Sequence, residues 1–226
     1  MSIKICDDLM QICNELNKEV LIASIITEVN VYESSQELKN LVHIKCEEVK
    51  YKYEVGNLEA MESIDHIKKV YRRLGTDPTR YKISSEALLK RVIKGKGLFT
   101  VNNVVEVNNI ISLISGYPVC AYDLENIKGE IKLSIGKTGE KYEGIGRGEI
   151  KVENIPVLYD EIGAFGSTTS DSTRTMVTEK TKKIIFSIVS FNGNNNINKF
   201  LDESIALLEK YCDARVLEIK LSNKKS

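Results

Sequence analysis

Hydrophobic and polar positions divide the chain into a first part with helical periodicity and a second part with strand periodicity. Val104, Val107, Ile111 and Ile114 recur at steps of three or four residues, which predicts a helix with one apolar face. From Asp123 onward, apolar and polar residues alternate between many glycines, a pattern typical of short strands joined by turns. These patterns favour an α+β fold in which helices pack on one side of a mixed or mostly antiparallel sheet.

The same patterns give approximate boundaries for the secondary-structure elements. We expect helices over residues 8–16, 34–51, 57–74, 84–92, 104–115 and 197–211. We expect strands over residues 3–6, 20–31, 130–135, 149–152, 157–160, 174–178, 183–191 and 216–221, and a disordered tail from residue 222. Ser34 stands three residues before Glu37, the spacing of a capping box, so we expect Ser34 to begin the second helix. Without a repeat or a long linker, residues 1–226 are expected to form a single domain.

Composition narrows the class of protein without naming a chemistry. Of the 226 residues, 42% are hydrophobic and 28% are charged, ordinary values for a globular protein. No apolar run reaches the length of a membrane helix, and the N-terminus lacks the pattern of a signal peptide, so we expect a cytoplasmic protein without a membrane partner. The five cysteines are scattered without a CxxC pair and only two histidines are present, so neither a metal site nor a cofactor is expected.

The net charge of zero hides an uneven distribution along the chain. Residues 1–65 contain six basic and thirteen acidic residues, whereas residues 66–97 contain ten basic and two acidic residues. A cationic segment of this kind favours contact with a nucleic-acid backbone. The alternative is a solvated helix face that pairs with the acidic part of the chain. The candidate cations are Lys68, Lys69, Arg72, Arg73, Arg80, Lys90, Arg91, Lys94 and Lys96.

Two segments resemble a known family. They are VNNVVEVNNIISLISGYPVCAYD, which ends at Asp123, and EIGAFG at residues 161–166. Both resemble the tRNA-editing domain of the β subunit of bacterial phenylalanyl-tRNA synthetase, and the core of the resemblance covers residues 68–190. Asn102, Asn109 and Pro118 match the family pattern, and so does Asp123. The resemblance implies a compact α+β module whose pocket receives the 3′ end of tRNA and hydrolyses the ester of a wrongly attached amino acid.

Several positions depart from the family pattern. Asn108 stands where the family has a threonine, Cys120 where it has a histidine, and Glu161 where it has the first glycine of the turn. In the family a glutamate recognises the phenol of the substrate. The corresponding position here is Phe186 or Ser187, neither of which is acidic.

The segment after the glycine turn is dense in hydroxyl and charged groups. Residues 167–175 have the sequence STTSDSTRT. Such a loop suits a phosphate, a ribose or an α-amino group as ligand. We expect Arg174 to bind a phosphate through two hydrogen bonds and Asp171 to accept a hydrogen bond from an ammonium group. The alternative is a surface loop whose hydroxyls satisfy its own turns.

The candidate site therefore has two parts besides the cations. Backbone amides at Gly163 are expected to face the carbonyl oxygen of the ester. The expected pocket residues are Asn108, Asn109, Cys120, Tyr122, Glu161, Gly163, Phe165 and Gly166. The residues expected to contact the substrate amino group or the ribose-phosphate are Asp171, Arg174 and Thr175.

The leading hypothesis is hydrolysis of mischarged aminoacyl-tRNA in trans, with tRNA as the partner and no DNA partner. The alternative is a non-catalytic tRNA-, RNA- or amino-acid-binding module that kept the fold. A third hypothesis, a small-molecule hydrolase that uses Cys120, is weaker, because no histidine lies near this thiol in sequence to lower its pKa. A Ser-His-Asp triad is not indicated, and the chain lacks a phosphate-binding GxxxxGK[ST] loop.

Overall fold

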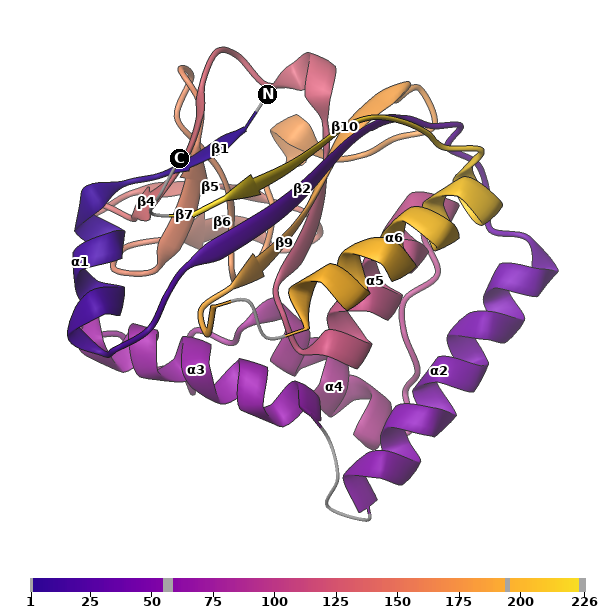
Figure 1. Ribbon diagram of the computed structural model, residues 1–226, viewed down its shortest axis with the longest axis horizontal. Helices are drawn as coiled ribbons and strands as arrows, with labels where there is room; N and C mark the ends of the chain where they lie inside the picture. The colour runs from indigo at the N-terminus through magenta and orange to yellow at the C-terminus, as the bar shows by residue number, and fades with distance from the viewer. Residues whose placement is uncertain (1, 55–58, 194–195, 224–226) are drawn as a thin grey trace.

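The computed structural model describes residues 2–54, 59–193 and 196–223 and shows an α+β fold, as expected (Figure 1). The helices are α1 (Asp7–Glu15), α2 (Gln36–Glu54), α3 (Glu59–Arg73), α4 (Ser84–Ile93), α5 (Asn103–Ser115) and α6 (Ile197–Cys212), with short 3₁₀ turns η1 (Leu124–Asn126) and η2 (Thr173–Thr175). The strands are β1 (Ile3–Ile5), β2 (Leu21–Glu28), β3 (Val119–Asp123), β4 (Ile131–Ile135), β5 (Lys141–Gly144), β6 (Gly148–Lys151), β7 (Pro156–Tyr159), β8 (Ala164–Ser167), β9 (Lys183–Ser190) and β10 (Arg215–Ser222). None of the helices in these described ranges is long and apolar enough to cross a membrane.

The described strands divide among two four-stranded sheets and a hairpin. One sheet has the order β10-β2-β9-β3 and is antiparallel throughout. The other has the order β1-β4-β7-β8, in which β1 and β4 run parallel and the remaining pairs are antiparallel. β5 and β6 form the hairpin. The N-terminal part of the chain therefore contributes one strand to each large sheet.

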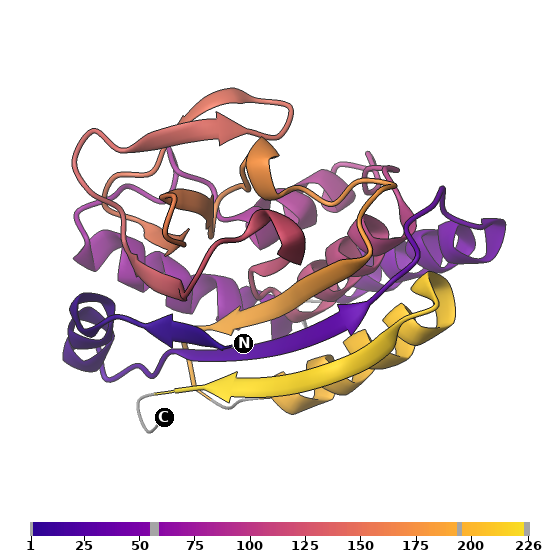
Figure 2. The ribbon, with the colours of Figure 1, turned by 90° about the horizontal axis from the view of Figure 1, so that it is seen from above.

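Strands β2 and β9 are buried on both faces because their sequences are almost continuously apolar. Leu21 and Ile25 of β2 contribute to the core beneath α5 and α6, whereas Ile22 and Ile26 contribute to the core on the opposite face. Figure 2 shows α6 on one side of these strands and the β4–β8 region on the other. The helices α3 and α4 pack into this second core, which also contains the candidate site.

The capping of α5 fixes where the strand β3 begins. Asn102 accepts a hydrogen bond from the backbone N–H of Val105 at 2.9 Å, as an N-cap residue does. At the other end, Gly116 has φ 72° and donates its N–H to the carbonyl of Ser112. This left-handed conformation favours glycine and stops the helix, so that β3 starts three residues later with Cys120 and Tyr122 on the same side.

Two expectations about local structure are wrong. The segment 174–178 is not a strand: η2 occupies Thr173–Thr175, because the chain turns after the isolated bridges of Asp171 and Ser172. The helix α2 is capped by Ser35, whose hydroxyl accepts from the N–H of Leu38 at 3.2 Å, rather than by Ser34. The hydroxyl of Ser34 is buried and has no hydrogen-bond partner among the described residues.

Other differences concern boundaries and short strands. The pattern did not predict β5, and it described β8 only as part of a glycine turn. The expected start of the third helix at residue 57 lies outside the described residues, as do positions 224–226 of the expected tail. Residue 222 ends β10 instead of beginning a disordered segment.

Phe186 provides a test of the core beneath α5 and α6. Its side chain is fully buried on β9, so we expect Phe186→Ala to lower the free energy of unfolding by about 3–5 kcal/mol. Phe99→Ala is a matched control, because Phe99 is largely exposed, and it should change stability by less than about 1 kcal/mol. Urea denaturation of both variants measures the difference. Equal losses would contradict this description of the core.

Candidate functional site

A cavity of about 730 Å³ lies between α4, α5, β3, the β5–β6 turn and the loop that follows β8. Its inner wall is apolar and comes partly from Leu133, Leu158 and Val189. Further apolar residues, including Leu88, Val105 and Val119, line it together with polar and cationic residues. The polar and charged lining residues, with the thiol of Cys120, are Lys82, Ser84, Lys90, Arg91, Lys94, Lys96, Thr100, Asn108, Asn109, Ser112, Cys120, Tyr122, Arg147, Ser167, Thr168, Thr169, Ser170 and Asp171.

A hydrogen bond joins Tyr122 and Asp171, two residues that line the cavity. The phenol of Tyr122 donates to Oδ1 of Asp171 at 2.5 Å. The ring of Phe165 supports the phenol ring edge-on, with the centroids 5.0 Å apart. Gly166 lies directly behind the pair, and a Cβ at this position would collide with the Tyr122 hydroxyl. The pair is therefore held between an aromatic ring and bare backbone.

Asp171 is the one acidic side chain among the described residues that line the cavity. Burial raises the pKa of Asp171 to about 7, although the hydrogen bond from Tyr122 acts in the opposite direction. Burial, together with the charge of Asp171, also raises the pKa of Tyr122 well above its ordinary value. At neutral pH the carboxyl group is therefore close to its titration midpoint while the phenol stays protonated.

Cys120 lies beside this pair as a buried thiol. Its Sγ contacts the backbone carbonyl of Ser187 at 3.7 Å. Burial, followed by the nearby charge of Asp171, raises the pKa of the thiol far above its ordinary value. A thiol in this environment is a poor nucleophile, which disfavours the hypothesis of a hydrolase that uses Cys120.

Only some of the polar residues of α5 and its cap line the cavity. Asn108 and Asn109 both line the cavity, and the buried Oδ1 of Asn108 has no hydrogen-bond partner among the described residues. Asn102 and Glu106 do not line it: the first caps the helix, and the second is buried elsewhere. Two adjacent amides of α5 therefore line the cavity.

The hydroxyl-rich loop is largely satisfied by its own contacts. Ser167 Oγ accepts the backbone N–H groups of Thr169 and Ser170, each at 3.2 Å. The hydroxyl of Thr168 hydrogen-bonds the buried phenol of Tyr71 at 2.5 Å. These bonds agree with the alternative interpretation of self-satisfied turns, yet the same loop also forms one wall of the cavity.

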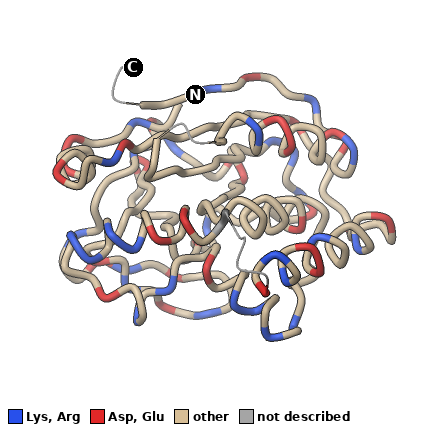
Figure 3. Tube along the Cα trace, turned by 60° about the horizontal axis from the view of Figure 1, so that its bottom comes forward, with Lys and Arg blue, Asp and Glu red and all other residues tan. Residues whose placement is uncertain are grey.

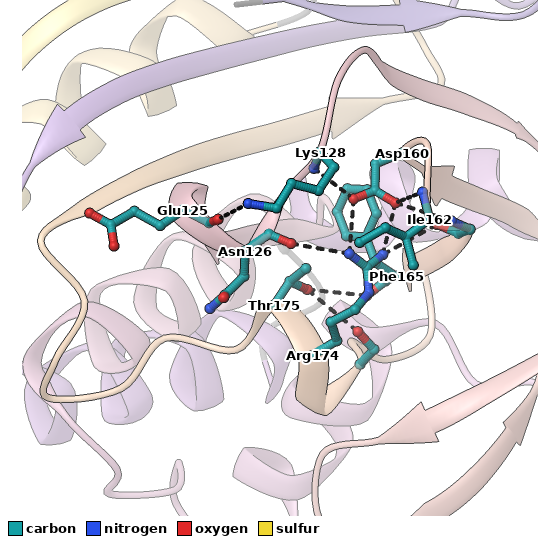
Figure 4. A network of polar contacts seen from close by, with 10 residues as sticks. Glu125, Asn126, Lys128, Asp160, Ile162, Phe165, Arg174 and Thr175 are labelled. Atoms are coloured by element: carbon teal, nitrogen blue, oxygen red, sulfur yellow. Dashed lines mark hydrogen bonds and ion pairs between the residues drawn. The ribbon is translucent and has the colours of Figure 1, made fainter.

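Arg174 lies apart from the cavity and is held by Asp160 (Figure 4). Its guanidinium donates to both carboxylate oxygens of Asp160, at 2.8 and 2.9 Å. Burial alone would raise the pKa of Asp160, but the hydrogen bonds from Arg174 and from backbone amides outweigh it, and the pKa is lowered. The guanidinium therefore already has a carboxylate in the position expected for a phosphate. Contact between Arg174 and a substrate stays a prediction.

The glycine turn also points elsewhere than expected. The N–H groups of Ile162 and Gly163 both donate to Oδ1 of Asp160, so these amides are not directed at the cavity. Glu161 and Thr175 likewise do not line it. Thr175 is fully buried beneath the loop. Phe165 and Gly166 contribute only from behind, by supporting Tyr122.

The nine candidate cations differ in whether they line the cavity and in whether they form ion pairs. Charges of both signs are spread around the trace (Figure 3). Lys68 and Lys90 both pair with the buried Glu86, and Lys69 and Arg73 also have acidic partners. Arg72 and Arg80 do not line the cavity. Those that do are Lys90, Arg91, Lys94 and Lys96.

The sequence patterns missed several lining residues. Lys82 belongs to the cationic segment but was not singled out, and Arg147 lies in the turn of the β5–β6 hairpin. The GIGRG sequence of that turn is a detectable signal, because glycines flank the arginine. Phe99 and Val101 also line the cavity. No group of three His, Cys, Asp or Glu side chains within the described ranges is arranged to hold a metal ion.

The fold and the cavity together describe an α+β domain whose cavity is lined by apolar residues, several cations and one carboxyl group. Residues 66–220 match the B3/4 domain family. This match covers more than half of the sequence, and the chain belongs to that family. The resemblance seen in residues 102–123 is thereby confirmed at the level of the family.

Related proteins include subunits of a much larger enzyme. The phenylalanine–tRNA ligase β subunit of Clostridium tetani (strain Massachusetts / E88) is 28% identical over 174 residues, which cover 71% of this chain and 21% of that subunit. The same subunit of Protochlamydia amoebophila (strain UWE25) is 32% identical over 112 residues, which cover 46% of this chain and 13% of the subunit. An N-terminal fragment of the phenylalanyl-tRNA synthetase β-subunit from Pyrococcus horikoshii has a TM-score of 0.44 and 18% identity, covering 50% of this chain and 40% of that one. The chain thus corresponds to a small part of the curated relatives.

The pair of Arg174 and Asp160 allows a first prediction at this site. The side chain of Asp160 is fully buried, so Arg174→Ala leaves an uncompensated charge and should lower the free energy of unfolding by about 3–5 kcal/mol. Arg215→Ala is the control, because Arg215 pairs with Glu28 on the surface and should cost less than about 1 kcal/mol. Guanidinium denaturation compares the two. A loss for Arg174→Ala no larger than the control would contradict the structural role.

Asp171 allows a second prediction, which concerns pH. Because the folded state raises its pKa to about 7, the folded protein binds a proton more tightly than the unfolded chain does. Wild type therefore loses stability as the pH rises from about 4 to about 7. Asp171→Asn keeps an acceptor for Tyr122 and removes this titration. Between pH 4 and pH 8 the variant should gain about 1–3 kcal/mol relative to wild type. A stability difference that does not change with pH would contradict the raised pKa.

Proposed function

We propose that this chain hydrolyses the ester bond of aminoacyl-tRNA that carries a wrong amino acid, and that it does so in trans as a single domain. The curated relatives are named as subunits of a tRNA ligase, which supports a tRNA partner. Such a substrate would place its action in the cytoplasm. The identity of the amino acid and of the tRNA is left to experiment.

The observation that carries the proposal is the distribution of charged groups in the cavity. One carboxyl group, that of Asp171, lines the cavity, and so do several cations, including Arg91, Lys94 and Arg147. An aminoacylated 3′ end has the complementary polarity, because a cationic α-ammonium group sits next to a chain of anionic phosphates. Opposite charges placed in this order orient a ligand as well as attract it.

In the proposed complex, the ammonium group donates to the free oxygen of Asp171, whose other oxygen accepts from Tyr122. Binding of the ammonium favours the ionised carboxylate and lowers its pKa. Asn108 and Asn109 lie within the same cavity and present amide groups to the polar atoms of the ester and the ribose.

The reaction consumes one water molecule. The water oxygen attacks the carbonyl carbon, the bond from that carbon to the ribose oxygen breaks, and a proton from the water passes to the ribose oxygen. The products are a free amino acid and tRNA with an intact terminal hydroxyl. Holding water and ester in position contributes to the rate without a strong protein base.

A non-catalytic binding module is the second candidate, and a specific observation favours it. Among the described residues that line the cavity there is no histidine. The resemblance places a glutamate at Phe186 or Ser187, but Phe186 is a fully buried apolar residue and Ser187 hydrogen-bonds Ser24 inside the core. Such a cavity is able to bind an aminoacylated end without a residue dedicated to proton transfer.

The deciding experiment is deacylation of a panel of correctly and wrongly charged tRNAs by the purified protein. We expect selective release of one class of amino acid. Asp171→Asn should raise KM by roughly 10- to 150-fold, the usual size of a lost charged hydrogen bond. This effect should disappear with N-acetylated aminoacyl-tRNA, which has no ammonium group.

The matched control is Asp202→Asn, because Asp202 is exposed on α6 and does not line the cavity. Its kinetics should equal those of wild type. Absence of release across the whole panel, together with measurable tRNA binding, would reject the hydrolase and support the binding module. An equal effect of Asp171→Asn on free and N-acetylated substrates would reject the ammonium contact.

A further inference from the structure

The mouth of the cavity exposes apolar side chains among its cations. Phe99 is 54% exposed, Val101 57% and Ile145 44%, and all three line the cavity. Phe99 and Val101 belong to the segment between α4 and α5, and Ile145 belongs to the β5–β6 turn. Two separate segments therefore bring exposed apolar groups to the same opening.

Arg91 holds the ring of Phe99 from one side. The guanidinium carbon lies 3.9 Å from the centroid of the ring, within the range of a cation–π contact. The Nε of Arg91 is buried and has no hydrogen-bond partner among the described residues. With one face of the ring occupied and about half of the side chain exposed, Phe99 offers a second face in a fixed orientation.

Two further cations, Lys94 and Lys96, line the same cavity and precede Phe99 on a sharply turned segment. Lys94 and Lys96 are exposed, and neither forms an ion pair with a residue in the described part of the chain. Gly95 and Gly97 have φ values of 71° and 60°, a conformation that favours glycine and reverses the chain after α4. The reversal leaves the two ammonium groups beside the mouth.

We propose that the mouth is a stacking platform for an unpaired nucleotide, with its base on the free face of Phe99 and its phosphates on Lys94 and Lys96. Every base has a π-face, so an aromatic ring beside cations binds single strands with little sequence preference. A paired base has both faces covered by its neighbours, so the platform selects a single-stranded end over a duplex. The RNA partner is taken from the proposed function, and the platform specifies which part of that RNA the mouth contacts.

The favoured partner is a nucleic acid rather than an acidic peptide because of the combination of groups. Carboxylates alone would be satisfied by Lys94 and Lys96 and would leave the ring unused. The apolar side chains of Val101 and Ile145 extend the surface on which a base or ribose can pack, while the cations suit a repeated phosphate charge.

The test uses uncharged RNA and therefore does not depend on hydrolysis. A hairpin RNA with a short unpaired 3′ tail is compared with the same hairpin with a blunt end, by fluorescence anisotropy over a range of salt concentrations. We expect the tailed hairpin to bind more tightly. Phe99→Ala should weaken its binding by about 5- to 150-fold, and Phe99→Tyr should restore wild-type affinity.

The charged groups should give a different signature. Lys94→Ala combined with Lys96→Ala should reduce the slope of log affinity against log salt by about 1.4, since each phosphate contact to a single strand contributes about 0.7. Phe99→Ala should leave this slope unchanged. Lys180→Ala combined with Lys182→Ala is the control, because these lysines are exposed, equally spaced in sequence and remote from the lining residues.

The outcomes separate this inference from the proposed hydrolysis. Equal binding of tailed and blunt hairpins, or binding by Phe99→Ala within twofold of wild type, would overturn the platform. Tail-dependent binding through Phe99, in a protein that releases no amino acid from any charged tRNA, would support the platform and reject the hydrolase.

Discussion

Antiparallel pairing of β2 with β9 is the contact on which both cores depend. These strands occupy the interior of the sheet β10-β2-β9-β3, and nearly all of their residues are buried. Because successive side chains point to opposite faces, each strand serves two cores at once. A shift of one residue in this register would exchange the two sets of side chains, and the cavity would lose Val189 from its wall.

The cavity is built on one face of that sheet and closed by parts that come from distant positions in the chain. β3 follows β9 in the sheet and carries Cys120 and Tyr122, whereas the loop with Asp171 follows β8 of the other sheet. The bond between Tyr122 and Asp171 therefore connects β3 of one sheet with the loop after β8 of the other, at the wall of the cavity. The cavity combines one weakly acidic group, Asp171, with exposed cations such as Lys94 and Arg147. Burying the acidic group costs folding free energy, and perturbed groups of this kind are typical of ligand sites.

Sequence patterns predicted the parts of this fold that have strong local signals. The helix α5 has both an apolar period and an asparagine cap, and it lies almost where expected. The continuous apolar run of residues 20–31 predicted a buried strand, and it is β2 (Leu21–Glu28). The short strands β5 and β8 were not predicted, because glycines weaken the alternation that marks a strand. Ser34 and Ser35 both satisfy the chemistry of a cap, and local spacing does not decide between them.

The candidate site was predictable only where neighbouring residues act together. Asn108, Asn109, Cys120 and Tyr122 come from adjacent segments and meet at the cavity. Arg174 looks like a phosphate-binding residue in sequence, but its bond to Asp160 depends on how β7 and η2 approach each other. Arg147 and Phe99 were missed for the same reason, since their place at the mouth results from tertiary packing of two distant turns.

Gly166 restricts which sequences of this family can share the floor of the cavity. Any side chain at this position would occupy the space of the Tyr122 hydroxyl. A relative with alanine or a larger residue there would need a shorter residue at the position of Tyr122. Its counterpart of Asp171 would then lose the hydrogen bond that Tyr122 donates here. The glycine and the tyrosine should therefore be inherited as a pair, and a relative that has exchanged both will present a differently shaped cavity to its ligand.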